Sequence, residues 1–172
     1  MELFFRDGFE AVTIEAISAR AEVSRRTFFR YFPTKESVFF HLHEERLGAF
    51  RAQLAAAPVD APPRRAVYEG LLAVGERYQA DREHTLAHNR ALHASPALAA
   101  YDLKLDAQWE RTIAAALEAS AESRLRAVVE AGAVMGVVRA VLRHWFDAGG
   151  AYDLPTAGRA AFAWLEQGLG RG

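Results

Sequence analysis

Residues 4–38 read FFRDGFEAVTIEAISARAEVSRRTFFRYFPTKESV and contain two short helical segments joined by a tight turn. Thr13 and Ser24 are suited to begin the two helices, because a hydroxyl at the N-cap accepts a hydrogen bond from a free backbone N–H. The second helix is expected to end at Pro33, which cannot continue it. This plan predicts a helix-turn-helix unit, whose second helix enters the major groove of DNA.

The second helix, residues 24–32, has two chemically different faces when successive residues are placed 100° apart. Its aromatic side is expected to pack against Ile14 and Ile17 of the preceding helix. Two guanidinium groups on the first turn of the other side suit the O6 and N7 acceptors of guanine. The packing side contains Phe28, Tyr31 and Phe32, and the free side contains Arg25, Arg26, Phe29 and Arg30, with Thr27 at the edge.

Positive charge is concentrated in this segment, although the whole chain has a formal net charge of −1 and an isoelectric point near 6.6. Residues 23–35 carry four basic side chains and no acidic one. Such a cluster beside the N-terminus of the next helix suits phosphate binding. Charge and spacing alone leave a second interpretation open, a solvated basic face on an ordinary helical hairpin.

The same segment carries a set of residues at fixed spacing that resembles the DNA-binding segment of the tetracycline-repressor (TetR) family of bacterial transcription regulators. The resemblance implies an all-α fold, with an N-terminal three-helix helix-turn-helix domain and a C-terminal helical ligand-binding and dimerisation domain. The positions that carry it are Gly8-Phe9, Thr13-Ile14, Ile17, Val23-Ser24, Thr27, Phe29, Tyr31-Phe32 and Thr34-Lys35-Glu36.

The resemblance also implies roles for individual side chains, with Arg25 and Arg26 as the base readers. Ser24 begins the helix that presents these side chains. Arg30 belongs either with the residues that face the major groove or with those that bind phosphates. The implied major-groove set is Arg25, Arg26, Thr27 and Phe29, and the implied phosphate set is Thr13, Tyr31 and Lys35.

Three residues depart from the family pattern. Glu22 stands in the turn where glycine is usual, and a non-glycine residue at positive φ costs on the order of 1 kcal/mol. Ser18 replaces the alanine that lets the two helices approach, and Phe29 replaces a frequent tyrosine. These departures leave the motif in place.

Helix-forming residues dominate the whole chain, and no alternating run of β-branched residues indicates a strand. Capping residues, proline and glycine divide it into about nine helices. We expect a DNA-binding domain over residues 1–40, whose first helix is cut short, and an effector and dimerisation domain over residues 41–172. The first helix is expected to end near Arg6, and the others to cover residues 13–20, 24–32, 34–55, 63–79, 82–93, 95–119, 122–147 and 153–168.

The helix over residues 122–147 is apolar nearly all round, which predicts that it is buried on two sides. Gly132 and Gly136, one turn apart, would permit another helix to approach closely. We therefore expect a homodimer, as the family resemblance also implies for the last two helices; a fully intramolecular core is the alternative. The candidate interface residues are Val134, Val138, Val141, Trp145, Phe162 and Trp164.

Polar and aromatic residues in the middle helices are candidates for an effector cavity, which the resemblance places there. These candidates are Tyr78, His88, Tyr101 and Trp109. His84 and His88 share a helical face at a spacing that could bind zinc or nickel, but no third ligand follows from the pattern. We expect no metal and no cofactor, and interpret these histidines as surface or cavity residues.

The composition excludes several function classes. The chain has no cysteine, hence no disulfide and no thiolate nucleophile. It carries none of the common catalytic motifs and no apolar run long enough to span a membrane, so we expect a cytoplasmic protein that is not an enzyme.

We therefore predict a ligand-responsive regulator, most simply a repressor that binds a palindromic DNA operator as a homodimer and responds to an unidentified small molecule. The alternative is a helical small-molecule-binding protein that has lost DNA binding.

Overall fold

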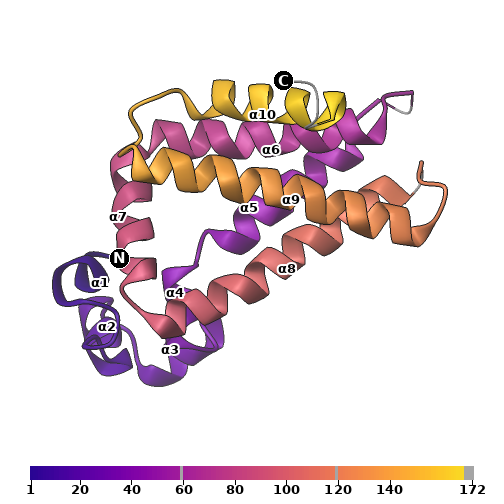
Figure 1. Cartoon of the computed structure of the whole chain (residues 1–172). Helices are drawn as coiled ribbons and strands as arrows, with labels where there is room; N and C mark the ends of the chain where they lie inside the picture. The colour runs from indigo at the N-terminus through magenta and orange to yellow at the C-terminus, as the bar shows by residue number, and fades with distance from the viewer. Residues whose placement is uncertain (59, 119, 169–172) are drawn as a thin grey trace.

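The computed structural model describes residues 1–58, 60–118 and 120–168, and these residues form helices joined by turns and loops, without a strand. Figure 1 shows three short helices at one corner and longer helices forming the body. The all-α prediction is confirmed. The helices are α1 (Glu2–Asp7), α2 (Ile14–Arg20), α3 (Arg25–Tyr31), α4 (Lys35–Phe39), α5 (His43–Ala55), α6 (Pro63–Ala80), α7 (Arg82–His93), α8 (Pro96–Glu118), α9 (Arg124–Asp147) and α10 (Leu154–Gln167).

Two of the predicted segments extend beyond the described residues. Ala119, where the helix before α9 was expected to end, lies outside the described residues, as do residues 169–172 of the expected C-terminal domain. None of the helices in the described ranges combines the length and the apolar character that crossing a membrane requires.

Side-chain caps begin α2 and α3 at the predicted residues. Thr13 Oγ1 accepts a hydrogen bond from the backbone N–H of Ala16 at 3.1 Å, and Ser24 Oγ accepts one from the N–H of Thr27 at 3.1 Å. Each cap satisfies one of the four N–H groups that a helix leaves free at its start. Both helices therefore begin where local chemistry places them.

The turn between α2 and α3 contains a residue in the left-handed region, as expected. Glu22 has φ of 54°, and no other described non-glycine residue has a positive φ. The turn is closed by a hydrogen bond from the N–H of Val23 to the carbonyl of Ser18, at 3.0 Å. Glu22 therefore has a strained backbone conformation, and this conformation is part of the turn that joins α2 to α3.

The single long helix predicted over residues 34–55 is two helices, α4 and α5, so that prediction was wrong. Residues 40–42 form turns in which hydrogen bonds join residues three apart instead of four. Phe39 points into the core of the N-terminal helices, while the ring of Phe40 stacks on Tyr101 of α8 at 5.4 Å. Both rings contact His88 of α7, and Phe40 in addition stacks on Tyr101, so the break lies where two consecutive aromatic residues pack against the body.

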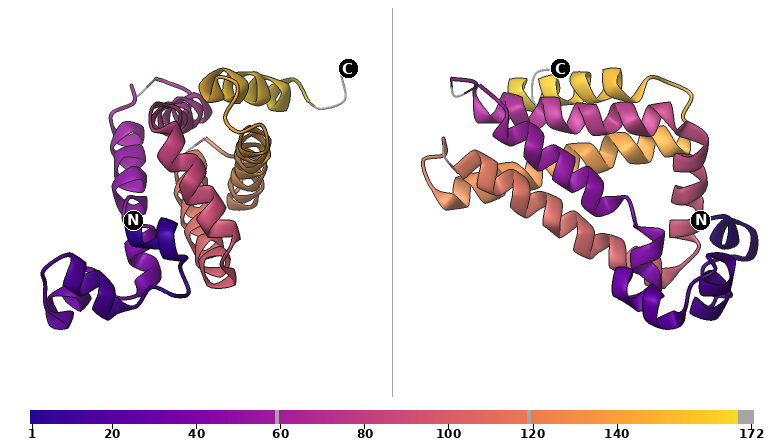
Figure 2. Two further views of the ribbon diagram at one scale, coloured as in Figure 1. Left: turned by 90° about the vertical axis from the view of Figure 1, so that its left-hand side faces the viewer. Right: turned by 180° about the vertical axis from the view of Figure 1, so that it is seen from behind.

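The core of the body lies between α5, α6, α8, α9 and α10. Its fully buried residues include Val67, Ile113 and Val134, and the rings of Tyr68 and Phe162 stack at 4.3 Å. Two views in Figure 2 show α8 beside α9 and α10 beside α6. Neighbouring helices thus pair across this core, which holds the body as one unit.

A second core joins the N-terminal helices to the body, and we call it the junction cluster. Its buried residues come from α1, the loop after it, α4, α7 and α8, and the lower end of α7 lies beside α1 (Figure 1). The ring of His88 on α7 stacks on that of Phe39 on α4, with centroids 4.0 Å apart. The junction cluster consists of Phe4, Phe9, Val12, Phe39, Leu92 and Leu98.

Three residues predicted at a subunit interface lie inside the chain. Val134 and Trp145 are fully buried, and Phe162 is 5% exposed. The indole N–H of Trp145 donates to the carbonyl of Tyr152 at 3.0 Å. These three predictions were wrong, because a side chain already buried in its own chain has no area left to contribute to a partner. Sequence periodicity shows that a helix is buried on two sides without showing by what.

Replacing Glu22 with glycine is expected to stabilise the protein. Glu22→Gly relieves the strained φ and should raise the free energy of unfolding by about 1 kcal/mol. The matched control is Ala21→Gly at the neighbouring residue, whose φ is −90°. There glycine only adds freedom to the unfolded chain, so stability should fall. Denaturant unfolding measures both, and a Glu22→Gly protein less stable than the wild type would contradict the expectation.

Candidate DNA-binding surface and internal cavity

The recognition helix α3 is held by one buried aromatic residue. Phe28 is 3% exposed, and its ring meets Phe32 at 5.9 Å. Ser18 on α2 is also buried, and its small side chain lies where the family pattern has alanine. Burial of Phe28 on one side of α3 leaves the opposite side facing outward.

The two predicted base-reading arginines lie on that outward side. Arg25 and Arg26 are both exposed, and Arg25 Nη1 forms an ion pair with Glu15 Oε1 of α2 at 2.8 Å. Phe29 lies beside them, 43% exposed, with the Arg25 guanidinium 6.0 Å from its ring centroid. An exposed guanidinium pair on the first turn of a short helix can form bidentate contacts with base edges.

Tyr31 lies on the surface, although placing successive residues 100° apart around the helix predicted that it lies on the packing side. It is 67% exposed, and its hydroxyl accepts a hydrogen bond from Arg30 Nη2 at 3.2 Å. The helix ends here, because Phe32 has φ of −129° and ψ of 103°. Tyr31 is the last residue of α3, and the packing side is filled by Phe28 and not by Tyr31, so the assignment of Tyr31 to that side was wrong.

Lys35, expected at a phosphate, also has a structural role. Its Nζ donates to the carbonyls of Phe9 at 2.8 Å and of Val12 at 3.0 Å, and lies 4.2 Å from the ring centroid of Phe9. Two of its three N–H donors therefore tie α4 to the loop between α1 and α2. Sequence reasoning missed this role, because every residue has a backbone carbonyl and the sequence does not show which ones Lys35 contacts.

The body contains a cavity of about 120 Å³ between α6, α8, α9 and α10. Tyr78 and Trp109, two of the four candidates for an effector cavity, line it, and so do Val138 and Val141, which were expected at a subunit interface. The remaining lining residues are Leu71, Leu72, Val74, Gly75, Asp106, Met135, Val137, Leu142, Leu154, Pro155, Gly158 and Phe162. The residues brought together are overwhelmingly apolar, which is typical of a binding site for a small molecule.

His88 and Tyr101, the other two cavity candidates, lie elsewhere, so these predictions were wrong. Both rings pack around the junction cluster, where Tyr101 stacks on Phe40 and His88 on Phe39. His88 Nε2 lies 3.2 Å from the carbonyl oxygen of Phe39, and burial lowers the pKa of His88 to about 4. His88 therefore packs as a neutral ring. In the parts of the chain that the structure describes, no three potential metal ligands gather.

Sequence reasoning missed two carboxylates that the fold makes important. Asp106 lies on the cavity wall, and Asp102 lies one turn before it on α8. Burial, together with the charge of Asp106, raises the pKa of Asp102 to about 6. Their spacing of four residues places both on one helical face, but only the packing of α8 shows that this face turns inward.

Two family models match the chain. Residues 1–42 match the model of the bacterial regulatory proteins of the tetR family, and residues 61–170 match the model of the MftR C-terminal domain. The HTH-type transcriptional regulator TcmR of Streptomyces glaucescens is 31% identical over 156 residues, which cover 85% of this chain and 69% of TcmR. A protein of Mycobacterium tuberculosis, described as the mycofactocin biosynthesis transcriptional regulator MftR, is 27% identical over 99% of this chain and 87% of its own length.

Solved structures share the fold. Thermus thermophilus FadR, a TetR family transcriptional repressor in complex with lauroyl-CoA, superposes with a TM-score of 0.71 at 20% identity, covering 98% of this chain and 90% of that one. The TetR family regulator PfmR of Thermus thermophilus superposes with a TM-score of 0.58 at 19% identity, covering 99% and 96%.

A helix-turn-helix with outward arginines, joined to a helical body that encloses a cavity, defines a DNA-binding transcription regulator. The chain belongs to the TetR family, because its two matched models together cover most of its length and the relatives named above are regulators of that kind.

Glu15→Gln is expected to raise the affinity for DNA of any sequence. The carboxylate of Glu15 pairs with Arg25 on the outward side of α3, so removing its charge frees Arg25 and lessens repulsion of phosphates. A gain of about threefold to tenfold is expected at low salt, measured by fluorescence anisotropy on duplexes. Glu118→Gln, an exposed residue at the far end of α8, controls for net charge. Equal gains in the two variants would contradict a local effect.

Asp102→Asn is expected to stabilise the protein at high pH only. A folded-state pKa raised to about 6 means that the native state keeps a proton which the unfolded state loses, so stability falls as pH rises from about 4 to above 6. Asparagine removes this loss of stability. The gain in the free energy of unfolding at high pH is at most about 3 kcal/mol for two pKa units, and nearer 1 kcal/mol because the side chain is partly exposed. Denaturant unfolding at pH 4 and pH 8 measures the difference, and a pH-independent effect would contradict it.

Proposed function

We propose that the chain is a repressor that binds a palindromic operator as a homodimer and releases it when a small molecule occupies the cavity. The observation that carries the proposal is the placement of α3, where Phe28 is buried and Arg25 and Arg26 are exposed. A helix held in this way presents fixed guanidinium groups to a groove, which a mobile surface arginine does not.

We assign DNA binding to residues 1–40 and effector binding and dimerisation to residues 41–172. Arg25 and Arg26 read bases, since they occupy the first turn of α3. The flanking polar groups position the helix on the backbone, because phosphate contacts fix orientation without reading sequence. These flanking groups are Thr13, Ser24, Thr27, Arg30, Tyr31 and Lys35, with Phe29 beside the base readers.

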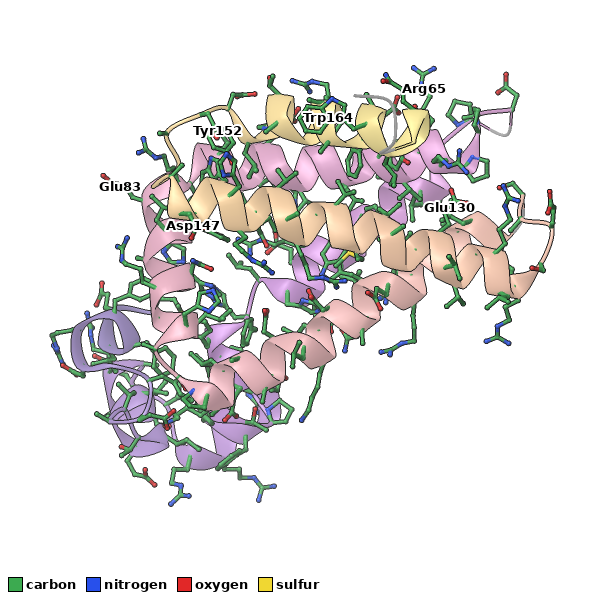
Figure 3. The ribbon with its side chains drawn as sticks, viewed as in Figure 1. Arg65, Glu83, Glu130, Asp147, Tyr152 and Trp164 are labelled. Carbon is green, nitrogen blue, oxygen red and sulfur yellow. The ribbon has the colours of Figure 1, made fainter. Side chains whose placement is uncertain are left out.

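Exposed apolar residues on the last two helices support a homodimer. Val128 and Val129 on α9 are each more than half exposed, and Trp164 on α10 is 61% exposed (Figure 3). A Cβ added at Gly132 or Gly136 would meet no atom within 4 Å, so α9 is open to close approach by a second chain along this stretch. A twofold dimer supplies two recognition helices for the two halves of a palindrome.

Helix α8 supports a connection between the cavity and the DNA-binding helices. It carries Asp106 and Trp109 at the cavity, and Leu98 and Tyr101 at the junction with α4. A ligand that moves α8 therefore acts on the packing of Phe39 and Phe40. Such a ligand weakens operator binding only to the extent that it prefers the conformation whose recognition helices are wrongly spaced.

The double variant Arg25→Ala and Arg26→Ala tests the proposal. Duplexes selected by the wild-type chain from a random pool should contain a palindrome and bind two chains per duplex in a mobility-shift assay. The variant should lose preference for these duplexes over scrambled ones, at a cost of about 1–3 kcal/mol for each bidentate contact.

The matched control is Arg65→Ala with Arg126→Ala, which removes the same charge from exposed arginines of the body. This control should retain the sequence preference. Undiminished preference in the α3 variant, or a selected site without two related halves, would contradict the proposal.

A further inference from the structure

The wall of the cavity is apolar except on its α8 side. Leu71, Met135 and Phe162 are typical of the residues that form it. Among the described residues that line the cavity, Asp106 is the only one with a charged side chain, and none is arginine, lysine or histidine. An apolar wall with one charged group on it selects among ligands by their charge.

The size of the cavity limits the apolar part of its ligand. Its volume is about 120 Å³, and an apolar cavity of roughly 150 Å³ holds a benzene molecule. There is room for about one ring or an equally small aliphatic group. The side chain of Asp106 is 28% exposed, so a polar group attached to that ring can meet the carboxylate at the edge that solvent reaches.

The carboxylate of Asp106 has unused capacity to accept hydrogen bonds. Its Oδ2 lies 3.4 Å from Arg139 Nη1, which is beyond the usual range, and Arg139 lies closer to Glu110 Oε1, at 3.2 Å. Within the described ranges no hydrogen-bond donor contacts Oδ1 of Asp106. An ionised carboxylate accepts about four hydrogen bonds, so most of its sites are free for a ligand.

Negative charge is in excess around this end of the cavity. Asp102 and Glu110 lie one turn to either side of Asp106 on α8, and the facing guanidinium groups are those of Arg139 on α9 and Arg46 on α5. Three carboxylates thus face two permanent positive charges, together with the imidazoles of His43 and His93. A ligand that brings a positive charge offsets this excess, whereas an anionic ligand increases the repulsion.

Aromatic residues in the cavity wall also favour a cationic ligand. Tyr78 and Trp109 line the cavity with Asp106. The Tyr78 ring is already occupied by the Arg46 guanidinium, 4.7 Å from its centroid, so the ring of Trp109 is the aromatic face that a ligand cation would use. Aromatic faces attract cations through the ring quadrupole, and this attraction is strongest where water is excluded.

We infer that the effector is a small monocyclic or similarly compact apolar molecule carrying one ammonium group, which the carboxylate of Asp106 receives. This assignment rests on the proposed function, because it names the chemical class of the effector for the same cavity. The apolar wall takes the ring, and Asp106 takes the ammonium by charge-assisted hydrogen bonds.

Three probes of matched size test the assignment by calorimetry on the full chain at pH 7.5. They are 2-phenylethylamine, which is cationic, 2-phenylethanol, which is neutral, and phenylacetate, which is anionic. The amine should bind at least about tenfold more tightly than phenylacetate, as one charge-assisted hydrogen bond predicts. Equal or tighter binding of phenylacetate, or no binding of the amine, would overturn the assignment.

Two variants locate the effect. Asp106→Asn keeps the shape of the side chain and should abolish the preference for the amine, while Glu118→Gln, at the exposed far end of α8 and away from the cavity, should retain it. Val138→Phe fills the cavity and should weaken all three probes together. Thermal unfolding checks that each variant is folded. An amine preference that survives Asp106→Asn in a folded protein would show that another group binds the ammonium.

Operator binding distinguishes this assignment from the proposed function. If the amine binds through Asp106 and leaves operator affinity unchanged, the ligand class stands and the coupling to DNA fails. If 2-phenylethanol releases the operator as well as the amine does, and Asp106→Asn changes neither effect, the regulator stands and the ligand class fails.

Discussion

The burial of Phe39 holds the DNA-binding helices to the rest of the molecule. This side chain is 1% exposed and contacts the rings of Phe4, Phe9 and His88, which come from α1, the loop after it and α7. Burial of a phenylalanine is worth roughly 1.5–3 kcal/mol, and close aromatic pairs add to this. The orientation of α3 relative to the body therefore depends on a compact apolar contact that rearranges as a unit or not at all.

The neutral state of His88 belongs to the same contact. A charged imidazole stacked on Phe39 would have to be desolvated, which is the reason that its pKa falls to about 4. On α8, burial of Asp102 beside Asp106 raises the pKa of the Asp102 carboxyl. The same helix carries Asp106 at the cavity and Tyr101 at the junction with Phe40. One helix thus contacts both the cavity and the aromatic cluster that holds the N-terminal helices.

Most of the helices and the outward position of Arg25 and Arg26 on α3 could be predicted from sequence, since their signals are local. Thr13 and Ser24 act on N–H groups three residues away, and the left-handed conformation of Glu22 follows from its place in the turn. The predictions that were wrong concern a helix break and side-chain contacts that depend on residues far apart in the sequence. The separation of α4 from α5 depends on packing of Phe40 against Tyr101, sixty-one residues later by number, and no local pattern records it.

By itself, the sequence determined an all-α chain with a helix-turn-helix, because caps, turns and helical periodicity act within a few residues. The tertiary structure alone decided which apolar residues form the core and which remain for a partner, so that Val134, Trp145 and Phe162 are internal and Trp164 is exposed. It also decided that Asp106 faces a cavity and that His88 does not. The reason is physical, since a residue's surroundings depend on which helix packs beside it, and that is set by the shape of the whole core.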